Sequence, residues 1–162
     1  MRQNTPSASR CEITQILPYH TINGADRLLG GYMLTCIDEV AAASARRFCR
    51  KAVTTALIDQ VEFIAPAKLG ELFSATGVVT RAGRTSVEVK VTGYVENDDG
   101  SRRLICRAYI VLVCLDENGK PSPVPELVCE TDEELRELAL AEERDCARRE
   151  RREKAGAAER KQ

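Results

Sequence analysis

The chain has 162 residues, with 24 lysines and arginines against 25 aspartates and glutamates and 43% apolar residues. One domain with a single sizeable core is expected at this length, and the near-neutral charge disfavours a nucleic-acid binder with a broad basic face. The longest uninterrupted apolar run, Ala108 to Leu115, has eight residues, less than half of the roughly 18 that a membrane-spanning helix needs. Because the first ten residues also lack the apolar stretch of a signal peptide, we predict a soluble, cytoplasmic protein without membrane contact.

Apolar periodicity predicts a strand, a long helix and then four more strands. In the helix, the apolar residues Met33, Ile37 and Val40 recur at steps of three or four. The later strands instead alternate apolar and polar residues. Because short turns separate these strands, we expect them to be antiparallel neighbours. Small residues at positions 41–45 allow the helix to lie closely across the concave face of a curved sheet. The predicted elements are a strand at Cys11–Ile16, the helix at Gly31–Phe48, and strands at Leu57–Ile64, Leu72–Thr80, Thr85–Val95 and Arg102–Leu115.

A separate, charged helix is predicted after residue 130. Thr131 and Glu134 have the spacing of a capping box. Residues 130–145 contain eight acids and two bases and residues 146–162 three acids and seven bases, an order that complements the helix dipole. We therefore divide the chain into a domain of residues 1–130 and a helical tail of residues 131–162. The tail is interpreted as a solvated helix, with a partner-binding or RNA-binding tail as the alternative.

The seven cysteines are odd in number and lie in a chain without a secretory signal, which favours reduced, mostly buried thiols. No pair has C-x-x-C spacing, and the single histidine, His20, cannot build a histidine cluster, so no metal site is predicted. The shortage of histidine also limits Ser-His-Asp or Cys-His catalysis. In a hydrolase, carboxylates would have to perform the chemistry.

A polar loop precedes Gly30-Gly31, which stand at the start of the long helix. The first backbone amides of a helix are unpaired and lie at the positive end of its dipole, so they can stabilise a carbonyl oxygen that gains negative charge. Glycine there lets a substrate come close. The alternative is a tight turn that packs beneath the sheet.

Two adjacent acids on this helix fall on different faces. Asp38 shares a stripe with Leu34 and Ala41 beside the apolar side, with no base three or four residues away, whereas Glu39 lies on a stripe that is polar at both ends. A carboxylate on the apolar side is costly to bury and needs a partner or a function. Asp38 is therefore the candidate for chemistry and Glu39 is expected to be solvated; amides of a neighbouring loop are the alternative explanation for Asp38.

A set of residues spread along the chain carries a resemblance to a known family: Asn23, Gly30-Gly31, Asp38, Thr54–Phe63, Pro66, Gly70, Gly83–Val89 and Asp116–Pro121. In their order and spacing they resemble the hotdog-fold acyl-CoA thioesterases of the cytosolic long-chain acyl-CoA hydrolase type. The resemblance extends from Pro18 to Pro125. It implies an α+β hotdog fold, with a long central helix wrapped by a curved antiparallel sheet, to which the charged C-terminal helix is added. It also implies dimers with one continuous sheet that assemble into hexamers as trimers of dimers.

The resemblance further implies a site shared by two subunits, in which an asparagine ahead of the glycine pair and an aspartate on the helix match Asn23 and Asp38. The segment Arg84-Thr85-Ser86 looks like the family's contact for the phosphates of CoA, and Gly30 would also contact substrate. The implied activity is hydrolysis of acyl-CoA to a carboxylic acid and CoA, without a cofactor because CoA is part of the substrate.

In this interpretation the Gly31 amide would hold the oxyanion, Asp38 would act as general base or nucleophile, and Asn23 would orient water or the thioester. Two other functions stay open. A hotdog dehydratase usually needs a catalytic histidine, for which only His20 is available. A non-catalytic acyl-CoA sensor would need an interaction segment, for which the charged tail is the candidate.

Overall fold

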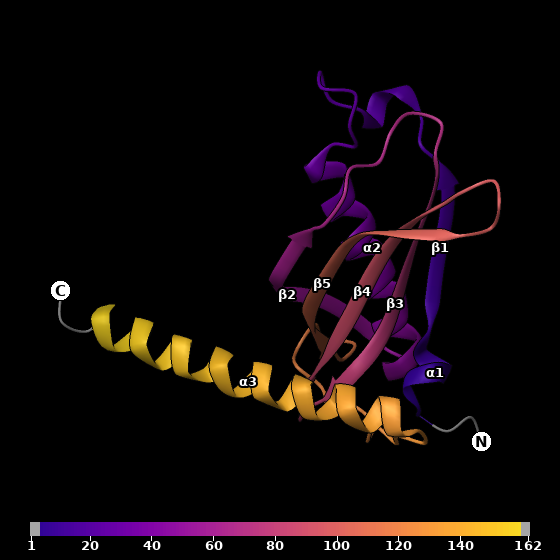
Figure 1. Ribbon diagram of the computed structural model, residues 1–162. Helices are drawn as coiled ribbons and strands as arrows, with labels where there is room; N and C mark the ends of the chain where they lie inside the picture. The colour runs from indigo at the N-terminus through magenta and orange to yellow at the C-terminus, as the bar shows by residue number, and fades with distance from the viewer. Residues whose placement is uncertain (1–3, 160–162) are drawn as a thin grey trace. The chain divides into compact units, whose positions relative to one another are not determined.

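The computed structural model describes residues 4–159, in which a long helix lies against a five-stranded sheet (Figure 1). The predicted order of strand, helix and four strands is confirmed. The elements are α1 (Pro6–Ser9), β1 (Cys11–Ile16), the short 3-10 helix η1 (Tyr19–Thr21), α2 (Gly30–Cys49), β2 (Ala52–Phe63), β3 (Leu72–Ala82), β4 (Ser86–Glu96), β5 (Arg102–Leu115) and α3 (Asp132–Glu159).

Strand β2 begins at Ala52, five residues before the predicted start at Leu57. The prediction was wrong there because it followed apolar residues, whereas Thr54 and Thr55 pair with Val113 and Leu112 of β5. β-branched threonine suits such a half-exposed edge strand.

The short helix α1 was not predicted. It is a local turn capped by Thr5, whose Oγ1 accepts a hydrogen bond from Ala8 N at 3.1 Å.

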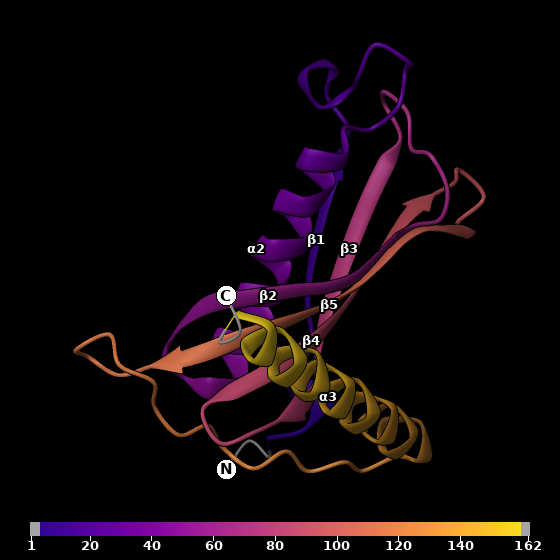
Figure 2. The ribbon, with the colours of Figure 1, turned by 90° about the vertical axis from the view of Figure 1, so that its left-hand side faces the viewer.

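All neighbouring strands are antiparallel, in the order β1-β3-β4-β5-β2, so β1 and β2 form the two edges of the sheet. Helix α2 contacts all five strands, and Figure 2 shows it along one face of the curved sheet. This is the predicted hotdog arrangement. The core lies between them, where Ile37 and Val40 of α2 and Phe73 and Val79 of β3 are fully buried.

Gly77 on β3 sets how closely α2 approaches the sheet. A Cβ atom at this position would stand 2.9 Å from the Val40 carbonyl oxygen and 3.4 Å from Ser44 Cβ. Only glycine leaves room for the helix backbone at this distance. The close approach confirms the expectation drawn from the small residues of the helix.

The chain divides into two compact units, Met1–Val128 and Cys129–Gln162. In the second unit, α3 begins with the predicted capping box, since Glu134 N donates to Thr131 Oγ1 at 3.2 Å and Thr131 N donates to Glu134 Oε2 at 3.3 Å. Ion pairs within the helix join Arg144 to Glu137 and Arg149 to Asp145, both at 2.8 Å.

Over residues 4–159, no helix combines the length and the apolar character required to cross a membrane.

Candidate functional site

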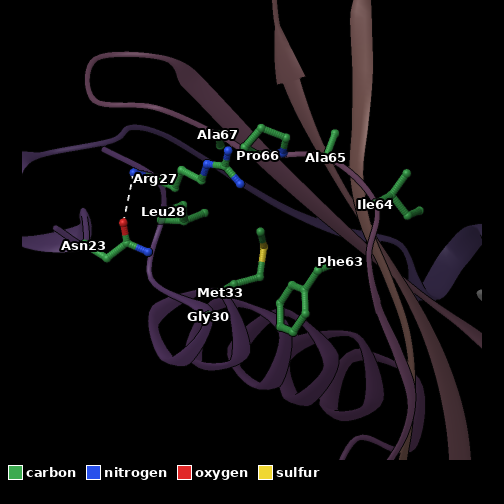
Figure 3. Close-up of a pocket in the computed structure, with 10 residues that line it drawn as sticks. All are labelled: Asn23, Arg27, Leu28, Gly30, Met33, Phe63, Ile64, Ala65, Pro66 and Ala67. Atoms are coloured by element: carbon green, nitrogen blue, oxygen red, sulfur yellow. Dashed lines mark hydrogen bonds between the residues drawn. The ribbon is translucent and has the colours of Figure 1, made fainter. Parts of the chain in front are cut away.

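Asn23 organises the loop that leads into α2. Its Oδ1 accepts hydrogen bonds from Ala25 N at 2.9 Å and Arg27 N at 3.2 Å, and its own backbone N–H donates to the Arg27 carbonyl at 2.8 Å. Asp26 completes this tight turn with a φ of 56°, in the left-handed region. In Figure 3 the Asn23 amide nitrogen points away from the turn, toward the side on which Gly30 lies. The side chain therefore keeps its two N–H donors for another molecule.

The start of α2 offers further donors. Leu29 is the N-cap residue and provides no side-chain hydrogen bond, so the amides of Gly30 and Gly31 have no partner inside the helix. A Cβ atom at Gly31 would meet nothing within 4 Å, and one at Gly30 would meet only the Phe63 ring, at 3.7 Å. The glycine pair is exposed and does not pack beneath the sheet. The space on the Cβ side of the glycine pair is therefore open.

A pocket of about 360 Å³ lies beside Asn23, between the loop, the first turn of α2 and the segment that follows β2 (Figure 3). Two of its lining residues, Asn23 and Arg27, are polar side chains from the loop. The others, which are apolar or glycine, are Leu28, Gly30, Met33, Phe63, Ile64, Ala65, Pro66 and Ala67. The pocket therefore combines an apolar wall with polar groups on one side, as small-molecule sites usually do.

Asp38 lies farther along α2 and is half-buried. Its Oδ1 accepts a hydrogen bond of 2.6 Å from Thr55 Oγ1, on the neighbouring edge strand β2. The partner is thus a strand hydroxyl and not the loop amides considered as the alternative. Glu39 is exposed, as predicted.

The sequence analysis gave no role to Thr55. It is one of two consecutive threonines ahead of the apolar part of β2, and nothing in the local pattern distinguishes it from Thr54. The distinguishing signal is tertiary: Thr55 pairs with Leu112, which is fully buried against α2, so its hydroxyl faces the helix.

The predicted site residues do not all meet in one chain. Asp38 is eight residues beyond Gly30 along α2, which corresponds to about 12 Å of helix, and it does not line the pocket beside Asn23. Arg84 is exposed on the turn between β3 and β4. Figure 1 shows this turn at the opposite end of α2 from the loop that carries Asn23.

The turn that carries Arg84, Thr85 and Ser86 is held by its backbone. The Arg84 carbonyl accepts a hydrogen bond from Val124 N at 3.1 Å, and the Thr85 carbonyl accepts one from Cys114 N at 2.9 Å. Gly83 N donates to the Ser86 carbonyl at 2.8 Å. A fixed backbone with an exposed guanidinium suits contact with an anion.

Cys49 and Cys106, two of the buried cysteines, have little nucleophilic character. All seven are unpaired and five are buried, as predicted. Burial raises the pKa of Cys49 to about 12 and that of Cys106 to about 11. Because the thiolate is the reactive form, these groups stay protonated and unreactive near neutral pH.

His20 is exposed and stacks edge-on against Tyr32, with ring centroids 6.3 Å apart. The side-chain contact of His20 is therefore with an aromatic ring and not with a carboxylate.

Across residues 4–159, no group of three or more His, Cys, Asp or Glu side chains is arranged to hold a metal ion.

Most of this chain is similar in sequence to known proteins. A sequence profile of the thioesterase superfamily matches residues 27–101. The uncharacterized acyl-CoA thioester hydrolase YkhA of Bacillus subtilis is 37% identical over 123 residues, which are 75% of this chain and 71% of that protein. The cytosolic acyl coenzyme A thioester hydrolase of Mus musculus is 29% identical over 137 residues, which are 80% of this chain but 36% of that protein.

Solved structures are similar over nearly the whole chain. The acyl-CoA hydrolase of Staphylococcus aureus, solved with butyryl coenzyme A, coenzyme A and coenzyme A disulfide, has a TM-score of 0.89 at 30% identity, covering 95% of this chain and 94% of that chain. An apo-hexameric acyl-CoA thioesterase has a TM-score of 0.88 at 36% identity, covering 93% and 97%. The S. aureus enzyme was also solved as three alanine variants, of an asparagine, of an aspartate 15 residues later and of a threonine 17 residues after that aspartate.

Proposed function

The chain belongs to the thioesterase superfamily, and on that premise we propose that it hydrolyses acyl-CoA thioesters to a carboxylic acid and free CoA. The observation that carries the proposal is the set Asn23, Asp38 and Thr55. These residues have the same types and the same separations, 15 and 17 residues, as the three positions replaced in the S. aureus acyl-CoA hydrolase. We assign the activity to residues 1–130 and none to the charged tail of residues 131–162.

The reaction consumes one water: the thioester R–CO–S–CoA and water give R–COOH and HS–CoA. The Gly31 amide, unpaired at the start of α2, holds the carbonyl oxygen as it becomes negative. Loss of such a contact costs roughly 3 to 4 kcal/mol of transition-state stabilisation. The Asn23 amide N–H groups orient the thioester or the water. Because thiolate already leaves readily, the site needs no strong acid and no cofactor.

Asp38 starts the attack on the thioester carbonyl by one of two routes. As general base it takes a proton from the water, whose oxygen attacks the carbonyl carbon, and the proton then passes to the departing sulfur. As nucleophile it would form an anhydride with release of CoA, and water would then hydrolyse that anhydride. In both routes the Thr55 hydroxyl, 2.6 Å from Asp38 Oδ1, holds the carboxylate in one orientation.

We propose that two chains build each site, with Asn23 from one and Asp38 from the other. Within one chain Asp38 does not line the pocket beside Asn23. Strand β2 is an edge of the sheet with twelve residues and a free hydrogen-bonding side in the single chain, a surface that favours pairing with another strand. Pairing of β2 with β2 of a second copy would continue the sheet, and the hexameric relative at 36% identity supports assembly of three such dimers.

The other two candidate functions have less support. A dehydratase would need His20 beside a carboxylate, whereas His20 stacks on Tyr32. A sensor without activity would not need the Asp38–Thr55 contact. The mouse relative that is named as cytosolic supports a cytoplasmic location.

Release of CoA thiol from a panel of acyl-CoAs tests the activity. We expect Asp38→Asn to lower kcat by about 100-fold to 10,000-fold, the usual cost of losing a general base. Glu39→Gln, one residue away but exposed, should keep near-normal turnover and serves as the matched control. Near-normal turnover by Asp38→Asn in a correctly assembled oligomer would contradict the assignment.

A further inference from the structure

The pocket beside Asn23 contains a cation that the proposed hydrolysis does not use. Arg27 lines this pocket, and its backbone is fixed by hydrogen bonds to both the side chain and the main chain of Asn23. Figure 3 shows its guanidinium extending from the loop toward Pro66 on the opposite wall. Within residues 4–159, this guanidinium takes part in no hydrogen bond or ion pair.

Within the single chain, the pocket lining supplies Arg27 with no counter-charge. Every other side chain that lines the pocket is uncharged. The nearby acid Glu71 is already occupied, because both of its carboxylate oxygens accept from Arg103 Nη2, at 2.9 and 3.2 Å, and one also accepts from Lys68 N at 2.8 Å. Arg103 also donates a hydrogen bond through Nη1 to the Pro66 carbonyl oxygen. Arg103 is thus a paired structural arginine, whereas Arg27 presents a free charge to the pocket.

The position of the pocket indicates which part of a substrate meets this charge. Asn23, which lines the pocket, is proposed to orient the thioester, and the Gly31 amide proposed to hold its carbonyl oxygen directly follows Gly30, another lining residue. A group in this pocket is attached to one side of that carbonyl, and the mainly apolar wall suits the acyl side better than the amide-containing pantetheine of CoA. Buried Leu28 and Met33 and the exposed Phe63 ring suit methylene groups, and a planar guanidinium suits a carboxylate, which it binds through two parallel hydrogen bonds.

We propose that Arg27 binds a carboxylate at the far end of the acyl group, so that CoA monothioesters of dicarboxylic acids are the preferred substrates. This inference rests on the proposed hydrolysis and names its substrate class. The chemistry at the thioester is unchanged: water is consumed, CoA is released, and the distal carboxylate takes no part in bond making.

The test compares thioesters with the same number of carbons, adipyl-CoA against hexanoyl-CoA and succinyl-CoA against butyryl-CoA. We expect the wild-type protein to have a kcat/KM at least tenfold higher for the carboxylated member of one pair. Arg27→Ala should lower that value by about 10-fold to 100-fold, the usual effect of losing a charge-assisted hydrogen bond, and change the uncharged member by less than threefold. Arg27→Lys should retain part of the preference, and added salt should reduce it.

Arg136→Ala, an exposed arginine of α3, is the matched control and should change neither value. Equal kcat/KM values for both members of each pair in the wild-type protein would overturn the proposal. An Arg27→Ala variant that loses activity equally on both members, but not on acyl-pantetheine, would also overturn it, since Arg27 would then bind a phosphate of CoA. If no thioester is hydrolysed, the proposed function fails, and calorimetric binding of adipyl-CoA and hexanoyl-CoA to wild type and Arg27→Ala still decides the role of Arg27.

Discussion

The hydrogen bond from Thr55 Oγ1 to Asp38 Oδ1, 2.6 Å long, joins the edge strand β2 to the helix α2. A carboxylate has several rotamers that differ little in energy, and only some of them aim an oxygen at a bound water. A donor on a neighbouring element selects one orientation before the substrate arrives, which removes part of the ordering cost from the reaction. We therefore expect Thr55 to act as a positioning residue through Asp38.

We expect Thr55→Val, which keeps the shape but removes the hydroxyl, to lower kcat by about 10-fold to 100-fold, as for a hydrogen bond to a charged group. KM should change little, because Thr55 does not line the pocket beside Asn23. Thr55→Ser restores the donor and should recover most of the rate. A merely structural threonine would instead show equal losses in the Val and Ser variants, accompanied by lower stability.

Strand β2, which contacts α2, contains two irregularities, one between Thr55 and Leu57 and one between Asp59 and Glu62. In a regular strand, residues three apart face opposite sides. The extra residue at the first irregularity lets both Thr55 and Ile58 pair with residues buried against the helix, Leu112 and Ile110. The second irregularity contains Gln60, whose φ of 49° lies in the left-handed region. Such bulges bend an edge strand and re-aim its side chains.

The contact between α2 and β3 gives a test of the packing. Gly77→Ala places a methyl group 2.9 Å from the Val40 carbonyl oxygen, a backbone atom that cannot rotate away. We expect the free energy of unfolding to fall by about 1 to 3 kcal/mol, the usual cost of overpacking a core, measured by urea denaturation.

Gly24→Ala is the matched control, because a Cβ atom at Gly24 would meet nothing within 4 Å. This variant should unfold at nearly the wild-type urea concentration. A Gly77→Ala protein as stable as wild type would mean that α2 can move away from β3 at little cost.

The proposed site residues lie at three separate places along α2. Asn23 and the glycine amides lie at the start of α2, Asp38 and Thr55 lie about two turns along it, and the turn with Arg84 lies at its far end (Figure 1). A single chain therefore contains the residues of the proposed site without bringing them together. A two-fold dimer provides a means of uniting them, because each chain's Asn23 can meet the partner's helix.

Mixed dimers test this sharing without a further structure. One Asn23→Ala chain paired with one Asp38→Asn chain has one site with both lesions and one intact site if the two residues come from different chains. Refolding an equal mixture should form mixed dimers about half the time, so roughly a quarter of wild-type sites should return. If one chain supplied both residues, every site would carry a lesion and the mixture would stay as inactive as its parents, with mixed dimers verified by mass.

Arg84 tests the binding of the nucleotide end of CoA. Its guanidinium is exposed on a fixed turn far from Asn23 of the same chain, so the CoA it contacts would be held by another chain's Asn23. We expect Arg84→Ala to raise KM for an acyl-CoA several-fold, less so at high salt, and to leave hydrolysis of the corresponding acyl-pantetheine unchanged. Lys120→Ala, in another exposed turn, is the control. Equal effects on both thioesters would make Arg84 a solvated turn residue only.

The sequence by itself determined the features that depend on near neighbours. The 3.6-residue period of α2, the alternation in the later strands, the capping box of Thr131 and Glu134 and the separate faces of Asp38 and Glu39 all follow from residues within about four positions of each other. The resemblance to the hotdog thioesterases added the pair Asn23 and Asp38, which no local rule connects.

The tertiary structure alone decided which elements touch. Thr55 becomes the partner of Asp38 only because β2 lies beside α2 and the pairing of Thr55 with buried Leu112 turns its hydroxyl to the helix. Arg27 faces a pocket only because the segment after β2 folds back against the loop that precedes α2, where Leu28 N donates to the Ala67 carbonyl at 2.8 Å. Strand twist, bulges and register set these contacts, and they depend on the packing of the whole sheet against the helix, whereas periodicity and capping depend on a few consecutive residues.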